Sequence, residues 1–116
     1  MNKSIKVYGI KNCDTVKKAI AYLNDCGTDF QFIDFRKNPI SQQVLKKMVD
    51  SVGWELLINK RSRTYRSLSE EEKSNINYDL VSKLPTLIKR PVLIHGEKIT
   101  VGFSEQQYAK FIDGAK

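Results

Sequence analysis

The chain has 116 residues, which is enough for one hydrophobic core and too few for two independent ones. Hydrophobic residues make up 41% of it and charged residues 28%, so the composition predicts a soluble globular protein and excludes a disordered or fibrous one. The net charge of +7 favours an anionic partner, which leaves nucleic acid, an acidic protein surface and a small anion as candidates.

The first third of the chain predicts a strand, a helix and a second strand. Residues 5–10 and 30–35 alternate apolar and polar side chains and are rich in β-branched and aromatic residues, as strands are. Between them lies an amphipathic helix, with Gly27 at the position of a C′ glycine. Its apolar stripe consists of Val16, Ala19, Ile20, Leu23 and Cys26, and its candidate N-cap residues are Asn12, Asp14 and Thr15. Two parallel strands joined through a helix form a right-handed βαβ unit.

The middle of the chain predicts a set of helices. Ser41 begins a helix with an apolar stripe, and Gly53 ends it. Ser69 and Glu72 have the spacing of a capping box, and short helices follow as far as Leu84.

The end of the chain predicts a hairpin and one more helix. Residues 91–101 alternate around a tight turn at Gly96 and Glu97. Ser104 then caps a last helix, whose buried face consists of Tyr108, Phe111 and Ile112. The complete order is therefore β-α-β, a helical insertion, β-β and α, which is an α/β fold.

The two cysteines have different settings in this pattern. Cys13 lies between a strand and a helix, where unpaired N–H groups and the helix dipole favour the nucleophilic thiolate, although neighbouring Asp14 opposes it. Cys26 continues the apolar stripe, which predicts a small core residue about 20 Å from Cys13 and outside disulfide reach. We therefore expect iodoacetamide to alkylate Cys13 well before Cys26, and any thiol that resolves Cys13 to come from outside the chain.

Other features define what the protein lacks. His95 is the only histidine and no C-x-x-C motif is present, so we expect no metal site, and His95 itself is typical of an exposed turn residue. The basic cluster of Lys60, Arg61, Arg63 and Arg66 contains one aromatic residue, Tyr65, which is a weak signal for nucleic acid and favours a solvated basic face. No apolar run is long enough for a membrane span or a secretory signal, so we expect a cytoplasmic protein.

Four segments in order resemble the ArsC/Spx family and are closest to its YffB-like branch. They are Tyr8–Ala19 (Y-G-I-K-N-C-D-T-V-K-K-A), Trp54–Arg61 (W-x-x-L-x-N-x-R), Ile88–Leu93 (I-K-R-P-V-L) and Val101–Glu105 (V-G-F-S-E). The resemblance covers nearly the whole chain. It implies one thioredoxin-like domain over residues 1–116, with a core of residues 1–38 and 86–116 and a helical insertion of about residues 39–85.

The resemblance also implies the residues of the site. It places Cys13 at the catalytic cysteine and Pro91 at the cis-proline of thioredoxin-like folds, so we predict a cis Arg90-Pro91 bond. Arsenate reductases of the family hold the oxyanion with three arginines. Arg90 matches one of them, Asn59 stands at the second with Lys60 and Arg61 as near substitutes, and Gly102 stands at the third. The expected substrate-binding residues are Asn12, Thr15, Lys60, Arg61, Arg90 and Pro91.

Two functions remain open after this comparison of motifs. Val16 stands where the Spx-type regulators have the second cysteine of C-x-x-C. The resemblance to the YffB-like branch, which has one cysteine, implies a single-cysteine, glutathione-dependent thiol reductase with no bound cofactor and weak or no arsenate reduction. The alternative is a binding module like Spx, which docks on an acidic protein partner such as RNA polymerase without catalysis. In either case we expect a monomer that binds neither a membrane nor nucleic acid.

Overall fold

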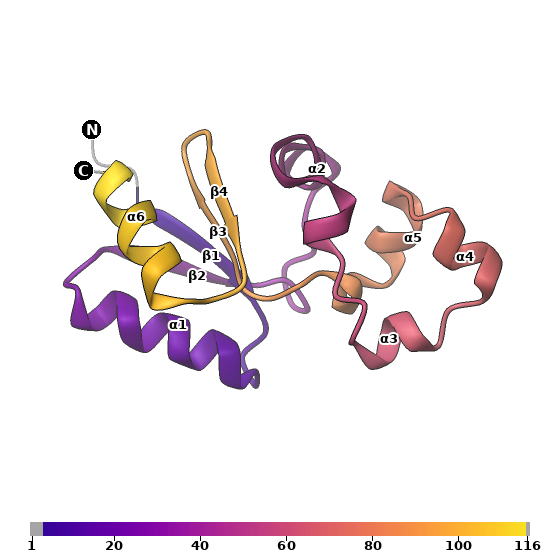
Figure 1. Cartoon of the computed structure of the whole chain (residues 1–116), viewed down its shortest axis with the longest axis horizontal. Coiled ribbons are helices and arrows are strands. Elements are labelled where there is room, and N and C mark those ends of the chain that lie inside the picture. The colour runs from indigo at the N-terminus through magenta and orange to yellow at the C-terminus, as the bar shows by residue number, and fades with distance from the viewer. Residues whose placement is uncertain (1–3, 116) are drawn as a thin grey trace.

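The protein is built on one four-stranded mixed sheet. A computed structural model describes residues 4–115; residues 1–3 and 116 of the predicted domain lie outside the described residues. The strands are β1 (Ile5–Gly9), β2 (Phe30–Asp34), β3 (Val92–His95) and β4 (Lys98–Val101), in the spatial order β2-β1-β3-β4. β1 runs parallel to β2 and antiparallel to β3, and β3 runs antiparallel to β4 (Figure 1). The predicted order of elements is therefore confirmed.

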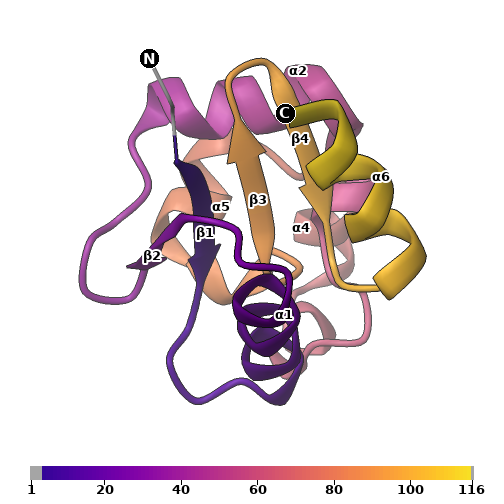
Figure 2. The same ribbon diagram turned by 90° about the vertical axis from the view of Figure 1, so that its left-hand side faces the viewer.

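Helices cover both faces of the sheet and create two hydrophobic cores. Helices α1 (Asp14–Asp25) and α6 (Glu105–Ala115) pack on one face, which Figure 2 shows in front, and α2 (Gln42–Leu57) and α5 (Tyr78–Lys83) lie behind. Because side chains alternate along a strand, Val7 and Leu93 enter the first core, whereas Tyr8 and Val92 enter the second. The sheet is thus the middle of three layers.

The segment between β2 and β3 forms a lobe of helices. Besides α2 and α5 it contains α3 (Arg63–Arg66), α4 (Glu70–Ser74) and the 3-10 helix η1 (Pro85–Leu87). Figure 1 shows these helices extending the molecule along its long axis, which measures 44 Å. None of the helices in the described part of the chain is long and apolar enough to cross a membrane.

Several local signals in the sequence are confirmed by hydrogen bonds. The Ser41 hydroxyl accepts from the Val44 N–H at 3.2 Å and begins α2, and Ser69 and Glu72 form both bonds of the capping box of α4. Gly53 interrupts α2 where the sequence predicts that the helix ends. It adopts φ 80° and ψ 160°, which are not helical values, and a second, short helical stretch follows it as far as Leu57.

The ends of α1 correct two expectations. The N-cap residue is Cys13, and Asn12, Asp14 and Thr15 are not caps, because the helix begins at Asp14 and the Cys13 carbonyl already accepts from the Lys17 N–H. Cys26 is exposed and is not a core residue. The helix ends at Asp25 and the chain reverses at Gly27, which has φ 66°, so Cys26 lies beyond the last turn that packs on the sheet.

Candidate active site

The register of the strands brings three distant segments to one end of the sheet. Tyr8 pairs with Val92, so the start of β3 lies beside the end of β1, and the chain leaves β1 toward Cys13 at that same end. Val92 also pairs with Val101, and the Gly102 N–H donates to the Pro91 carbonyl at 2.8 Å. The segments that carry Cys13, Arg90-Pro91 and Gly102 therefore meet at the carboxyl end of β1.

Cys13 lies at the N-terminus of α1 with its thiol outside the hydrogen bonding of the helix. Its backbone is extended, at φ −120° and ψ 122°, and its side chain makes no capping hydrogen bond. The side chain is half-buried. The first backbone N–H groups of a helix have no intrahelical acceptor and carry partial positive charge, so the Cys13 sulfur lies beside unpaired donors and the positive end of the helix dipole.

The distance between β1 and α1 is set by a close approach at Gly9. This residue is buried, and a Cβ atom built on it would lie 2.8 Å from Cγ2 of Val16 in the first turn of α1. Real Cβ atoms do not approach a neighbour so closely. The absence of a side chain at position 9 therefore allows the helix N-terminus, with Cys13, to lie directly against the end of the strand.

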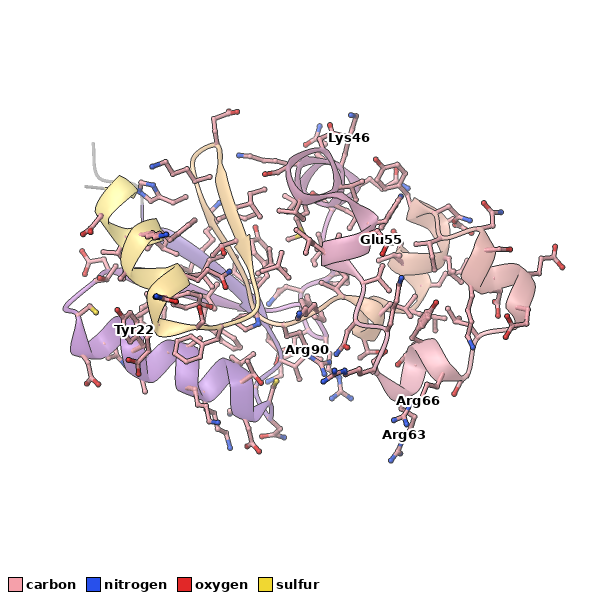
Figure 3. The ribbon with its side chains drawn as sticks, in the orientation of Figure 1. Tyr22, Lys46, Glu55, Arg63, Arg66 and Arg90 are labelled. Atoms are coloured by element: carbon pink, nitrogen blue, oxygen red, sulfur yellow. The ribbon has the colours of Figure 1, made fainter. Side chains whose placement is uncertain are left out.

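Arg90 and Pro91 form the second part of the site. The Arg90-Pro91 bond is cis, as predicted. Pro91 is buried and Arg90 half-buried, and none of the ion pairs within residues 4–115 involves Arg90. Figure 3 shows Arg90 between the sheet and the helical lobe. Its guanidinium is thus a cation without an acidic partner at the end of the sheet where α1 begins.

Tyr108 holds the third segment in place, and sequence reasoning assigned it only to the core. Its buried hydroxyl donates to the Gly102 carbonyl at 2.7 Å, while the Gly102 N–H bonds Pro91 on the other side. Burial raises the pKa of the Tyr108 phenol, which therefore stays a donor. Gly102 has φ 82°, so the site needs glycine at this position. A tyrosine four residues into a helix, next to a predicted Gly-Phe-Ser turn, carries no sequence signal for such a bond.

Lys60 and Arg61, the basic residues of the helical lobe that were predicted to bind substrate, are not brought to Cys13 by the strand register. Lys60 Nζ forms an ion pair with Glu55 at 2.9 Å, and Arg61 is exposed. The antiparallel bridge between Ile58 and Ile88 leads the chain after Asn59 away from Arg90. The side chains of Arg63 and Arg66 point outward from α3 at the lower edge of the lobe in Figure 3.

Asn12 and Thr15 flank Cys13, and both are exposed. They lie close to the thiol by their position in the chain, so their predicted role in substrate binding stays a prediction. The same holds for Lys60 and Arg61. Among the described residues, no group of three or more His, Cys, Asp or Glu side chains gathers in a way that would hold a metal ion.

Aromatic rings pack together near the C-terminal end of α1. The Tyr22 ring lies 5.9 Å from Phe103 and 6.1 Å from Tyr108, measured between ring centroids, in edge-on geometry. Partial desolvation, and then a hydrogen bond with the Cys26 thiol, raise the pKa of Tyr22.

The fold is thioredoxin-like, with a helical insertion. Its sheet has the order β2-β1-β3-β4 and is built from a βαβ unit and an antiparallel hairpin. A cysteine lies at the N-terminus of the first helix, and a cis-proline precedes β3 at the same end of the sheet. Residues 8–111 match the model of the ArsC family. The chain belongs to the ArsC family.

Relatives of known sequence and structure agree with this assignment. An uncharacterized protein of Haemophilus influenzae is 40% identical over 108 residues, which cover 90% of this chain and 95% of the relative. The solved structure of a YFFB protein is 33% identical, with a TM-score of 0.86 over 92% of this chain and 97% of that one. An arsenate reductase (ArsC) related protein from Brucella melitensis is 38% identical, with a TM-score of 0.75 over 97% of both chains.

Regulators are also among the similar proteins. The global transcriptional regulator Spx of Lactiplantibacillus plantarum is 25% identical over 111 residues, which cover 91% of this chain and 84% of the regulator. The family thus includes arsenate reductase-like proteins and transcriptional regulators on one fold.

Proposed function

We propose that the protein is a thiol oxidoreductase that uses Cys13 alone and takes glutathione as an external co-substrate. The observation that supports this most directly is the half-buried Cys13 thiol at the N-terminus of α1, at the same end of the sheet as Arg90 and cis-Pro91. A cation and a helix N-terminus together favour both a thiolate and an anionic substrate. Glutathione carries two carboxylates, so it fits a site with one unpaired arginine.

The reaction is a pair of thiol–disulfide exchanges. The Cys13 thiolate attacks the glutathionyl sulfur of a mixed disulfide; a Cys13–glutathione disulfide forms, and the substrate leaves as a thiolate that takes up a proton. A second glutathione, as its thiolate, then attacks this disulfide, which releases oxidised glutathione and regenerates the Cys13 thiolate. In sum, the substrate sulfur is reduced and two glutathione sulfurs become one disulfide.

External resolution of Cys13 follows from the placement of the other thiol. Cys26 caps the opposite end of α1, a helix of 12 residues. At about 1.5 Å per residue, the helix alone separates the two cysteines by roughly 18 Å, far more than a disulfide spans. Val16 occupies the position where C-x-x-C would supply a second cysteine. A reducing compartment rich in glutathione, such as the cytoplasm, would suit this chemistry.

Arsenate is a poorer candidate for the substrate than a disulfide. Position 102 would have to supply an arginine for a complete oxyanion cradle, and here it is a glycine with φ 82°. A small tetrahedral oxyanion depends on being surrounded by donors, so we expect arsenate reduction by the wild-type protein to be weak or undetectable.

The alternative is a binding module that works without catalysis. It is favoured by the similarity to the global transcriptional regulator Spx and by the exposed basic residues of α3. Such a protein would dock on an acidic surface of a partner such as RNA polymerase. Capture of one protein from lysate, equal for the wild type and Cys13→Ser, would support this function and contradict the first.

The decisive experiment is an assay coupled to glutathione reductase with a glutathionylated peptide as substrate. We expect turnover by the wild type and by Cys26→Ser, and a Cys13–glutathione adduct in the mass spectrum when the second glutathione is withheld. The same assay with arsenate should show little or no turnover. Peptide reduction that survives Cys13→Ser, or vigorous arsenate turnover, would overturn the proposal.

A further inference from the structure

One edge of the sheet remains open in a groove far from Cys13. β4 is an edge strand, because it pairs with β3 alone. Figure 2 shows α6 in front of this edge and α2 behind it. Between the two helices lies a hollow of about 680 Å³, lined by Ile99 and Thr100 of β4, by Gln107, Lys110 and Phe111 of α6, and by Ser51 of α2.

The register shows which backbone groups of β4 face this hollow. His95 and Lys98 flank the two-residue turn, so they form a hydrogen-bonded pair, and Leu93 with Thr100 is the next such pair. The bond from the Gly102 N–H to the Pro91 carbonyl continues the alternation. The backbone groups of Ile99 and Val101, which lie between these pairs, therefore point away from β3 and into the groove.

Part of this edge is already covered from within the protein. The Gln107 side-chain amide donates to the outward carbonyl of Val101 at 2.9 Å and to the Thr100 hydroxyl. This amide confirms the outward direction of the Val101 carbonyl. It covers the Val101 carbonyl at the end of the edge nearest the cis-proline, and the N–H and C=O of Ile99 face the groove farther along the strand.

The groove continues onto α2 and is rich in lysine. A second hollow of about 560 Å³ shares Ser51 and Glu97 with the first and follows the exposed side of α2. Four of the residues that line the two hollows are lysines and two are carboxylates, and one carboxylate, Asp50, is already paired with Lys46 at 2.6 Å. The lysines are Lys46, Lys47, Lys98 and Lys110.

We propose that this groove binds an extended, acidic segment of a partner protein, which adds to the sheet as a strand beside β4. Outward N–H and C=O groups on one residue are the complement of a peptide backbone. Lysines on both walls are the complement of carboxylates on the alternating side chains of such a strand. The inference does not depend on the proposed function, because the hairpin tip lies at the opposite end of the sheet from Cys13.

Other occupants fit the groove less well. A second copy of this chain would bring two lysine-rich walls of a protein with a net charge of +7 together. Nucleic acid would meet the lysines, but its phosphates would also meet the outward carbonyl of Ile99, which repels them. An acidic peptide satisfies both the charge of the walls and the hydrogen bonds of the edge.

The test measures binding of a fluorescein-labelled octapeptide of alternating glutamate and valine by fluorescence anisotropy. We expect saturable binding that weakens roughly tenfold with Lys110→Glu or Lys47→Glu, because each replaces an attraction by a repulsion. Lys37→Glu makes the same change of charge in the loop after β2 and should bind the peptide as the wild type does. In amide spectra, the peptide should shift Ile99, Thr100 and Gln107 and leave Gln31 on the opposite edge unchanged.

A backbone variant separates strand addition from attraction of charges alone. Ile99→Pro removes the outward N–H without removing a bond to β3, and edge strands tolerate proline at such positions. Ile99→Val retains the N–H and most of the packing. We expect Ile99→Pro to abolish peptide binding and Ile99→Val to retain it, with both variants folded by circular dichroism.

Four outcomes would overturn the proposal. The first is an absence of saturable binding up to about 1 mM peptide, and the second is equal binding by Ile99→Pro and Ile99→Val. The third is tighter binding of a single-stranded oligonucleotide with the same sensitivity to Lys110→Glu. The fourth is a concentration-dependent dimer that Ile99→Pro dissociates, which would assign the groove to a second copy of the chain.

Discussion

The two ends of α1 each carry a cysteine, and they differ in almost every other respect. At the N-terminus, Cys13 is half-buried and lies at the end of the sheet where Arg90 makes no ion pair with any other residue that the structure describes. At the C-terminus, Cys26 is exposed and lies beyond an aromatic cluster that joins α1 to α6. A thiol at an N-terminus has the positive end of the helix dipole beside it, and a thiol at a C-terminus has the negative end. Position along the helix, and not greater exposure, therefore favours Cys13 over Cys26 as the reactive thiol.

The largest expected effect is loss of turnover in Cys13→Ser. A serine hydroxyl does not form the mixed disulfide, so reduction of a glutathionylated peptide should fall to the uncatalysed rate. Cys26→Ser should retain the wild-type rate in the same coupled assay. Equal losses in the two variants would mean that both ends of the helix take part in the chemistry.

Tyr108→Phe tests the support of the site by α6. The variant leaves the Gly102 carbonyl without its donor in a buried place, so we expect a loss of about 1–3 kcal/mol in the free energy of unfolding. Urea denaturation followed by circular dichroism measures it. Tyr22→Phe removes a hydroxyl of the same cluster that is not fully buried and should cost less than about 0.5 kcal/mol. Similar losses in both variants would show that ring packing, and not the bond to Gly102, is what matters.

Arg90→Ala tests the cation near the N-terminus of α1. Its removal should slow formation of the Cys13–glutathione disulfide roughly tenfold, because a charge-assisted contact to the substrate carboxylate is lost. Arg63→Ala removes the same charge from α3, where the side chain projects into solvent, and should leave the rate unchanged (Figure 3). Stopped-flow measurement with oxidised glutathione gives both rates. A rate for Arg90→Ala like that of the wild type would exclude Arg90 from the site.

Protein stability at alkaline pH tests whether the Tyr108 hydroxyl is a buried donor. Burial raises the pKa of Tyr108, so the unfolded chain loses this proton at a lower pH than the folded protein does. The stabilisation is complete below the ordinary tyrosine pKa of about 10 and is lost as the pH rises above it, by at most about 1.4 kcal/mol per pH unit. Urea midpoints between pH 9 and 11 should therefore fall more steeply for the wild type than for Tyr108→Phe. Parallel curves would contradict a buried donor.

The smallest expected effect is on alkylation. Because Cys26 is exposed, burial does not protect it from iodoacetamide as its place in the apolar stripe predicts. Only its position at the negative end of the helix dipole, with Cys13 at the positive end, still favours reaction at Cys13. At about 0.3–1 kcal/mol for such an effect, iodoacetamide should react two- to fivefold faster with Cys13, as peptide mass spectrometry would show. Faster labelling of Cys26 would mean that accessibility outweighs the helix terminus.

Local signals in the sequence predicted local structure well. Ser41, Ser69 and Gly27 each act within one helical turn, and the hydrogen bonds found there are the expected ones. Cys26 shows the limit of periodicity, which indicates the face of a helix but not where the layer beneath it ends. Gly53 does interrupt the helix, but the pattern gave no sign of the short helical stretch that follows it.

The candidate site depended on contacts that no local pattern contains. The pairing of Tyr8 with Val92 joins residues more than eighty positions apart, and it was the resemblance to a family that placed Arg90 and Pro91 beside Cys13. Neither the sequence pattern nor the resemblance predicted the ion pair between Lys60 and Glu55 or the hydrogen bond between Tyr108 and Gly102. Both depend on where side chains point after the chain has folded.

Gly9 has a consequence for how the reactive sulfur is positioned. A single methyl group at this residue would overlap the Val16 side chain and would push the first turn of α1 away from the sheet. The helix N-terminus would then carry Cys13 outward, away from the segment that holds Arg90. The distance of the Cys13 sulfur from the sheet is therefore determined by the absence of a Cβ atom at Gly9, four residues before the cysteine.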